Sequence, residues 1–251
     1  MTGRVARYDT IGSGYTLTRR ADRRIGAQIG RAIGAAATVV NVGAGTGSYE
    51  PIDRIVVAVD PSEVMLRQRH PMAPPGVLAT AERLPFANRS FDVAMATTTV
   101  HHWTDRGAGL REMRRVADRQ VILLCEPSRR NWMWLTDDYF PAMRDLDTEK
   151  AAATAESLSH HLDVRTVEVV PIPRDCEDGF GGAYWNRPDA YLDPSVQAGI
   201  SMFRMLDPSI VASGTARLAD ELASGEWDQK YGHLRSRAQI DLGYRLVIAG
   251  D

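Results

Sequence analysis

The sequence predicts an α/β fold built on a mostly parallel sheet, and three observations lead to this prediction. Short apolar runs rich in β-branched residues recur between residues 38 and 125. Segments with helical periodicity separate most of these runs, which is the pattern of β–α–β units. The runs are nearly continuously apolar, as expected for strands that helices cover on both faces. With 44% apolar and 25% charged residues, the 251-residue chain has the composition of a globular protein with one sizeable domain.

The elements are expected in a regular order along the chain. Residues 15–36 form an amphipathic helix, because apolar side chains recur there at helical spacing. Strands are expected at 38–42, 55–60, 77–81, 91–96 and 120–125, with helices at 62–69 and 106–116. The later part is expected to contain helical segments within 131–160, a strand at 164–172, a helix at 217–223 and a last strand at 244–249.

A single domain is expected to span residues 1–251. Residues 1–36 form its N-terminal cap helices, residues 37–127 form its core, and about 173–215 form a lid inserted into it. The stretch 176–215 is rich in proline, glycine and aromatic residues and is too long for an ordinary loop. An insertion that covers a substrate is therefore favoured over a separate domain.

Charge and cysteine content exclude several classes of protein. A net charge of −2 disfavours a broad basic face for nucleic acid. Cys125 and Cys176 show neither a CxxC pair nor metal-ligand spacing, so we expect no metal site and a reducing cytoplasm. No run approaches the roughly 18 apolar residues that a membrane span needs. The Arg-rich start of the chain also lacks the apolar run of a signal peptide.

A glycine-rich loop follows the first predicted strand directly, with the sequence GAGTGS at residues 43–48. Glycines allow positive φ and let the backbone approach a ligand closely. Asp60 ends the second predicted strand, where a carboxylate can accept both hydroxyls of a ribose. NAD, FAD and S-adenosylmethionine proteins all use such a pair, and a tight turn with a helix cap is the structural alternative. Ser48 stands where the dinucleotide fingerprint requires glycine, which favours S-adenosylmethionine, a ligand without phosphate.

Several motifs in order resemble the class I methyltransferases of the type 11, ubiquinone-methylase-like group. They are residues 39–47 (VVNVGAGTG), 59–62 (VDPS), 81–86 (AERLPF), 90–93 (SFDV) and 101–105 (HHWTD). The resemblance covers roughly residues 36–127, and the segments 134–141, 175–180 and 191–194 more weakly resemble a bacterial subgroup. It implies a Rossmann-like fold with a seven-stranded, mostly parallel sheet whose last strand is antiparallel. The cofactor is then expected over the carboxyl ends of the strands.

The resemblance also implies which residues bind the cofactor. The glycine loop faces the methionine half, Asp60 holds the ribose, and Met65 covers one face of the adenine. Thr80 stands where the family usually has Asp, so the adenine contact is expected to be weaker or shifted to Glu82. The full expected set is Tyr15, Arg20, Gly43, Ala44, Gly45, Gly47, Asp60, Pro61, Ser62, Met65, Thr80, Ala81, Glu82, Thr97, Thr98 and His102.

Each of these roles has a structural alternative. Thr97 and Thr98 end the fourth predicted strand, where β-propensity alone would explain them. The N-terminal segment, with Tyr15 and Arg20, is expected to cap the cofactor, since an arginine can pair with the methionine carboxylate. An amphipathic surface helix is the alternative for that segment.

Candidate catalytic residues follow the fourth and fifth predicted strands. His101 is the first candidate for a general base, because a histidine needs little tuning to act near neutral pH; His102 lies beside it and Glu126 is the second candidate. A loop or helix-terminal carboxylate is the alternative for Glu126. The residues expected to bind the substrate are Tyr8, Asp178, Phe180, Tyr184 and Trp185. The lid aromatics could stack a flat or cationic substrate, or could form a small core of the lid itself.

The sequence therefore predicts transfer of a methyl group from S-adenosylmethionine to a small-molecule acceptor, of the kind found in secondary metabolism, with S-adenosylhomocysteine as product. The accepting atom and the oligomeric state stay open at this point. Two alternatives remain: an S-adenosylmethionine-binding protein with a non-methylating activity, and a nicotinamide oxidoreductase. A nucleic-acid methylase is disfavoured, because TTTV stands at residues 97–100 in place of a [DN]PP[YF] signature.

Overall fold

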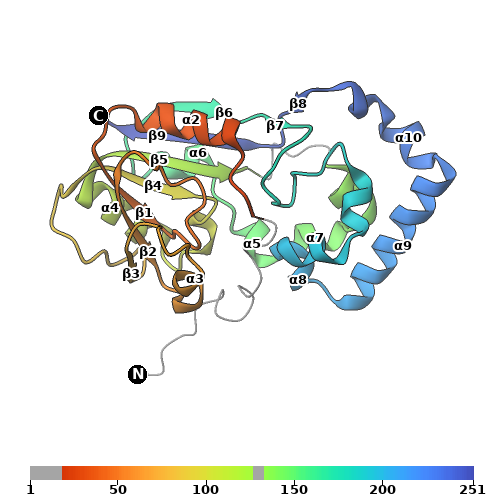
Figure 1. The fold of residues 1–251 in the computed structure, drawn as a ribbon, viewed down its shortest axis with the longest axis horizontal. Helices are drawn as coiled ribbons and strands as arrows, with labels where there is room; N and C mark the ends of the chain where they lie inside the picture. Colours follow the sequence, from red (N-terminus) through yellow and green to blue (C-terminus); the bar gives the residue numbers. More distant parts are fainter. Residues whose placement is uncertain (1–18, 127–132) are drawn as a thin grey trace.

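A seven-stranded sheet forms the centre of the structure, a computed structural model that describes residues 19–126 and 133–251 (Figure 1). The strands lie in the order β3-β2-β1-β4-β5-β9-β6. Their bounds are β1 Thr38–Val42, β2 Ile55–Asp60, β3 Gly76–Leu78, β4 Phe91–Thr97, β5 Ala117–Cys125, β6 Val164–Val169 and β9 Tyr244–Gly250. β9 is antiparallel to both of its neighbours, whereas β1 to β5 pair in parallel. The predicted α/β fold with an antiparallel last strand is confirmed.

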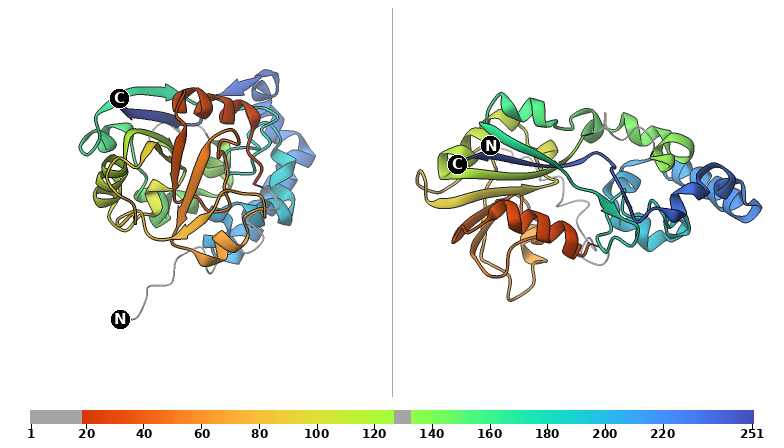
Figure 2. Two further views of the ribbon diagram at one scale, coloured as in Figure 1. Left: turned by 60° about the vertical axis from the view of Figure 1, so that its left-hand side comes forward. Right: turned by 90° about the horizontal axis from the view of Figure 1, so that it is seen from above.

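Helices bury both faces of the sheet, as the apolar strands predicted. Adjacent residues of a strand point to opposite faces, and Val39 and Val40 of β1 accordingly belong to different apolar clusters. Helix α2 (Arg23–Ile33) packs its apolar side on the Val39 face, and α4 (Arg106–Val116) packs on the Val40 face together with α6 (Ala155–Ser159) (Figure 2). Helix α3 (Glu63–Arg67) lies beside β2 and β3.

A helical lobe lies at the end of the sheet toward which the parallel strands run (Figure 1). We define the lobe as residues 133–150 together with 174–238. Its elements are η4 Leu135–Tyr139, η5 Pro141–Asp145, α5 Asp147–Lys150, η6 Pro188–Leu192, α7 Pro194–Gly199, α8 Ser201–Met205, α9 Pro208–Ser224, α10 Glu226–Tyr231 and η7 Gly232–Ser236. The short strands β7 (Ile172–Pro173) and β8 (Gln239–Ile240) pair at its base.

An aromatic core holds the helical lobe together. The ring of Trp134 lies 5.3 Å from that of Trp227, 5.5 Å from that of Tyr191 and 5.7 Å from that of Tyr139, in edge-to-face geometry. Such pairs stabilise beyond the area they bury. Trp134, Trp227 and Tyr191 are at most 2% exposed. The lobe therefore has an apolar core of its own, which continues into the cluster on the α2 face of the sheet.

Several element boundaries differ from the sequence prediction. The predicted strand 164–172 is interrupted at Pro171, which lacks an N–H for a sheet ladder, so β6 ends at Val169. The helical stretch expected within 131–160 is divided into short helices. Helix α9 begins at Pro208, capped by Asp207, well before the predicted start at residue 217. None of the helices in the described part of the chain has the length and apolar character needed to cross a bilayer.

Asp22 joins the start of α2 to the base of the helical lobe. Its buried carboxylate accepts hydrogen bonds from the amide and guanidinium of Arg24 and from the amide of Glu177. Burial alone raises the pKa of this carboxyl, but the hydrogen bonds from Arg24 and Glu177 outweigh burial and lower the pKa to about 2. The stabilisation is therefore complete above the unfolded pKa of about 3.9 and is lost as the pH falls through the folded value.

We expect Asp22→Asn to lower the free energy of unfolding by about 1–2 kcal/mol at pH 7 and by much less near pH 2, where about half of the Asp22 carboxyl is already protonated in the folded protein. Urea unfolding at both pH values measures the difference. Asp53→Asn is the control, because the Asp53 side chain is 68% exposed. An equal loss at both pH values would contradict the charge-based explanation.

Candidate active site

The glycine loop turns sharply at the carboxyl end of β1. Gly43, Gly45 and Gly47 have φ values of 73°, 52° and 97°, in the region that favours glycine. The amides of Gly43 and Ala44 both donate to the carbonyl oxygen of Val59, which holds the loop against β2. A Cβ at Gly43 would lie 2.2 Å from the Thr99 Oγ1. The loop therefore requires glycine here for steric reasons as well as for its φ.

Residues 43–54 connect β1 to β2 by turns alone, without a helix. Dinucleotide-binding proteins place the pyrophosphate on the amides of a helix N-terminus at this connection. The connection between β1 and β2 contains no helix here, so its amides do not form such a phosphate-binding site. A ligand without phosphate fits this loop better than NAD does.

Asp60 lies beside the glycine loop at the carboxyl end of β2. Its Oδ2 accepts from the Gly45 amide and its Oδ1 from the Ser62 amide, both at 2.8 Å. The Asp60 carboxylate therefore lies beside the glycine loop, where the ribose hydroxyls of the cofactor are expected. The Ser62 Oγ accepts from the Met65 amide and caps α3, and the Met65 methyl lies 3.2 Å from the Cβ position of Gly45. Three residues expected to bind the cofactor thus meet at the loop, while Pro61 is exposed.

A buried charged group lies under Gly47, and the sequence analysis did not identify it. Arg69 donates two hydrogen bonds to the Glu50 carboxylate, at 3.0 and 2.7 Å, and both side chains are at most 6% exposed. The Asn41 Nδ2 donates to the Glu50 Oε1, whereas the buried Asn41 Oδ1 lacks a hydrogen-bond partner among the described residues. A polar residue inside the apolar run VVNV was the available signal, since buried amides need partners.

The residues expected near the adenine lie on the loop after β3. Thr80 is exposed, and Ala81 is 5% exposed. The Glu82 Oε1 accepts from the amides of Thr104 and Asp105, at 2.8 and 3.1 Å. Glu82 therefore ties this loop to the segment after His102, and it places a carboxylate at the edge where the adenine is expected.

The backbone is strained where β4 ends. Thr98 has φ 49°, a left-handed conformation that costs a β-branched residue about 1–3 kcal/mol. Its amide donates to the Leu123 carbonyl of β5 at 2.7 Å. The next residue, Thr99, contacts the glycine loop at Gly43. Thr99 therefore lies beside the glycine loop, next to Thr97 and Thr98, which the sequence predicts to bind the cofactor.

His101 and His102 form one turn of helix directly after this strained strand end. The helix η2 spans Val100–His102, and the two imidazole centroids are 3.9 Å apart. Both side chains are half-buried. Helix α5 of the helical lobe contacts η2. The pair therefore lies between the carboxyl end of β4 and the lobe, where a general base would be required.

Glu126 follows β5 and is 5% exposed. Its Oε1 accepts from the amide of Ala155, the first residue of α6, at 2.8 Å, and its Oε2 lies 3.9 Å from the Arg245 Nε. Charges of this sign stabilise a helix N-terminus. This geometry favours the structural alternative for Glu126 and leaves His101 as the stronger candidate base.

The residues expected to bind the substrate occupy two different environments. Phe180 and Tyr184 are half-buried, and the Phe180 ring lies 4.8 Å from that of Tyr244. Trp185 is 1% exposed, and its indole N–H donates to backbone carbonyls near β7, so it packs within the core. Tyr244, which the sequence analysis missed, starts the antiparallel strand β9 opposite Cys125 and so lies at the carboxyl end of the parallel strands.

Asp178 and the N-terminal candidates complete the expected set. Asp178 is 1% exposed and accepts from Arg19 and Tyr49. Arg20 is exposed, whereas the side chain of the neighbouring Arg19 is 9% exposed. Tyr8 and Tyr15 lie outside the described residues. Arg19, rather than Arg20, is therefore a buried cation next to this site.

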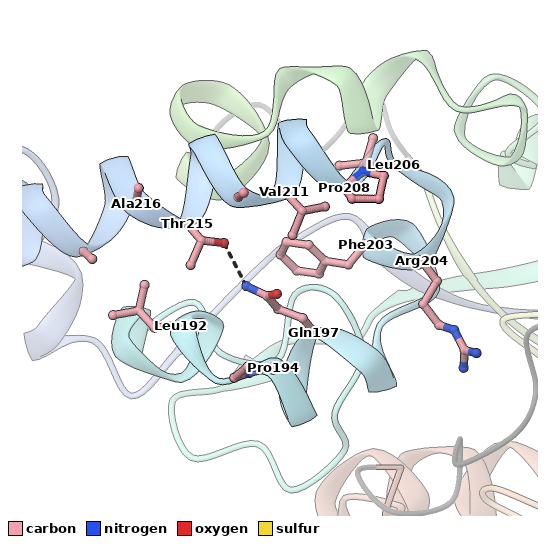
Figure 3. A pocket seen from close by; sticks show the side chains of 12 residues that line it. Leu192, Pro194, Gln197, Phe203, Arg204, Leu206, Pro208, Val211, Thr215 and Ala216 are labelled. Atoms are coloured by element: carbon pink, nitrogen blue, oxygen red, sulfur yellow. Dashed lines mark hydrogen bonds between the residues drawn. The ribbon is translucent and has the colours of Figure 1, made fainter.

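An apolar hollow of 650 Å³ lies within the helical lobe, between η6, α7, α8 and α9 (Figure 3). Leu192, Phe203 and Val211 line it, and the Gln197 Nε2 donates to the Thr215 Oγ1 across it at 2.9 Å. None of its lining residues belongs to the site expected from the sequence.

Comparisons with known proteins identify the family. Residues 40–125 match a family described as a methyltransferase domain. A structure described as a candidate methyltransferase from an antibiotic biosynthesis pathway of Anabaena variabilis is 30% identical. It superposes over 93% of this chain and 99% of that chain with a TM-score of 0.84.

Two further proteins resemble parts or all of the fold. The uncharacterized protein YafE of Escherichia coli K12 is 50% identical over 86 residues, which are 32% of this chain and 40% of that protein. The [4+2]-cyclase SpnF is 14% identical and superposes over 97% of this chain and 93% of that chain with a TM-score of 0.56, which shows the fold alone. The methyltransferase-domain match at residues 40–125 and the 30% identity to the Anabaena protein over 93% of this chain show that the chain belongs to the S-adenosylmethionine-dependent methyltransferases of the type 11 family.

Proposed function

We propose that this protein transfers a methyl group from S-adenosylmethionine to a small-molecule acceptor. The observation that carries the proposal is the glycine loop beside Asp60, at the strand ends that the helical lobe covers. A lobe over the site favours an acceptor of limited size and excludes water from it. The Anabaena relative, described with an antibiotic biosynthesis pathway, supports an acceptor from secondary metabolism.

The described residues fit the cofactor. A Cβ at Gly43, Gly45 or Gly47 would meet a neighbouring side chain within 3.2 Å, so the loop requires glycines, whose backbone a ligand can approach closely. In the proposed arrangement Asp60 accepts the ribose hydroxyls and Met65 lies against the adenine. The Asn41 Oδ1, which is buried without a partner, is available to the ammonium of the methionine half. S-adenosylmethionine supplies a methyl group that its sulfonium already activates.

The protein then has to orient the acceptor and remove its proton. Phe180, Tyr184 and Tyr244 provide aromatic surface for orientation, and alignment of the reacting atoms is the main requirement of such a transfer. An imidazole nitrogen of His101 accepts the proton where the accepting atom carries one. In this proposal residues 1–251 act as one domain, with 37–127 holding the cofactor and the helical lobe covering the acceptor.

Formation of S-adenosylhomocysteine tests the proposal. The purified protein is incubated with S-adenosylmethionine and a panel of small phenols, amines and carboxylates, and products are detected by mass spectrometry. Methylated acceptor together with S-adenosylhomocysteine is the expected result. Tight S-adenosylmethionine binding without its turnover in any acceptor mixture would indicate the non-methylating alternative. Binding of NADH in preference to S-adenosylhomocysteine in a calorimetric titration would overturn the proposal.

We expect His101→Gln to lower kcat about 100-fold, the low end of general-base effects, while the affinity for S-adenosylhomocysteine stays within about twofold. The amide preserves much of the shape of the imidazole but cannot take up the proton. His233→Gln, in η7 of the helical lobe, is the matched control. A wild-type turnover in His101→Gln would remove His101 from the mechanism.

A further inference from the structure

Asp178, which the sequence predicts to bind substrate, lies at the centre of a buried contact between three segments. Its Oδ1 accepts from the Arg19 Nε at 2.5 Å, and its Oδ2 accepts from the Arg19 Nη2 at 3.2 Å and from the Tyr49 hydroxyl at 2.8 Å. Arg19 precedes α2, Tyr49 follows the glycine loop, and Asp178 lies in the lobe between β7 and η6. We call this group the Arg19–Asp178–Tyr49 clasp.

Tyr49 adopts a strained conformation at the end of the glycine loop. Its φ is 64°, which is unusual for a bulky side chain and persists only where the surroundings impose it. The buried ring lies against α2 at Gly26, and the hydroxyl is fixed by Asp178. Burial and the Asp178 carboxylate raise the pKa of the Tyr49 hydroxyl, so it stays protonated and donates at neutral pH. A shift of the loop at Gly47 therefore moves the Tyr49 hydroxyl, which donates one of the hydrogen bonds to Asp178.

The turn that contains Asp178 is held at further points. The Arg24 Nη1 donates to the Asp175 Oδ1 at 2.7 Å, and the Glu177 amide donates to the Asp22 Oδ2 at 3.1 Å. Residues 175–178 and 19–24 thus form one connected unit. Phe180 follows two positions after Asp178, and its ring packs on Tyr244 at the strand ends. The clasp therefore connects the cofactor loop to the aromatic residues that we assign to the acceptor.

We propose that Tyr49 and Asp178 are positioning residues that couple methyl-donor binding at the glycine loop to the placement of residues 178–184 over the acceptor. This inference rests on the proposed function, because it needs a donor at the loop. A buried carboxylate with three donors cannot lose one of them without an energetic penalty, so the loop and the lobe segment move together.

Hydrogen exchange of the full chain tests the coupling, with S-adenosylhomocysteine as the probe. In the unsubstituted protein, the probe is expected to slow amide exchange both in residues 43–49 and in residues 174–184. In Tyr49→Phe, which removes only the hydroxyl, the slowing at 43–49 persists and the slowing at 174–184 disappears. Tyr191→Phe is the matched control, because its buried hydroxyl donates to the Gly181 carbonyl within the lobe and does not reach the loop. Both effects persist in that variant.

Affinity provides the second readout. Tyr49→Phe is expected to bind S-adenosylhomocysteine about 5-fold more weakly, the lower end of typical coupling between sites. Asp178→Asn, which keeps one acceptor oxygen and loses the other together with the charge, also removes the slowing of exchange at 174–184 at least in part. If S-adenosylhomocysteine still slows amide exchange at 174–184 in Tyr49→Phe, the proposed coupling is wrong, but the proposed function is unaffected. Failure of the unsubstituted protein to bind S-adenosylhomocysteine would overturn the proposed function and the coupling with it.

Discussion

Asp60→Ala is expected to weaken binding of S-adenosylhomocysteine by about 2–4 kcal/mol, since hydrogen bonds to a charged acceptor are worth about 1.5–3 kcal/mol each. The substitution removes the acceptor for the ribose hydroxyls and also frees the amides of Gly45 and Ser62. Both effects act on the same ligand, because the Gly45 amide belongs to the glycine loop. Isothermal titration calorimetry measures the loss directly.

Two further variants separate these effects for Asp60. Asp60→Asn keeps an oxygen acceptor without the charge, and it should retain part of the affinity. Asp53→Ala removes an exposed carboxylate a few residues after the glycine loop and should leave the affinity unchanged. An Asp60→Ala protein that binds S-adenosylhomocysteine as tightly as the unsubstituted chain would disprove the assigned role.

Gly43→Ala is expected to lower the free energy of unfolding by about 2–5 kcal/mol and to abolish cofactor binding. An alanine at positive φ costs about 1–2 kcal/mol, and overpacking adds about 1–3 kcal/mol. The overpacking arises because the new Cβ would lie 2.2 Å from the Thr99 Oγ1. For a chain of this size each kcal/mol lowers Tm by about 2–4 °C, so thermal unfolding resolves the effect.

Gly225→Ala is a matched control for Gly43→Ala. Gly225 has φ 78°, close to the 73° of Gly43, but a Cβ there would meet nothing within 4 Å. Gly225→Ala therefore measures the cost of an alanine at positive φ without the steric clash. Thr99→Ala in the Gly43→Ala background removes the nearest atom of the clash and should restore part of the stability. Equal losses in the two single variants would contradict the steric explanation.

Sequence patterns predicted the parts of this protein that depend on local chemistry. The run ending at Val42 and the run ending at Asp60 form β1 and β2 because β-branched residues favour buried strands, and the motif order identified the family. Helix α9 was predicted in part only. Its first half contains Ser213 and Gly214, which have weak helical propensity, although the Asp207-Pro208 start is a recognisable cap signal.

Features that depend on distant contacts could not be predicted in the same way. Glu50 and Arg69 pair across 19 positions, and Asp178 meets Tyr49 across 129 positions. No local pattern in the sequence indicates that Glu50 pairs with Arg69 or that Asp178 pairs with Tyr49. The left-handed conformations of Thr98 and Tyr49 run against residue preference, and they follow from the surrounding packing. Such positions are common at functional sites, where local preference and the fold disagree.

The place of β9 in the sheet has a consequence for how the chain matures on the ribosome. β9 lies between β5 and β6, yet it is translated only after the whole helical lobe. The buried strand β5 therefore stays unpaired along one edge until β9 emerges. Such delayed closure of distant contacts slows folding and exposes strand edges to aggregation. We expect chaperone dependence during synthesis to end abruptly once residues 244–250 leave the exit tunnel.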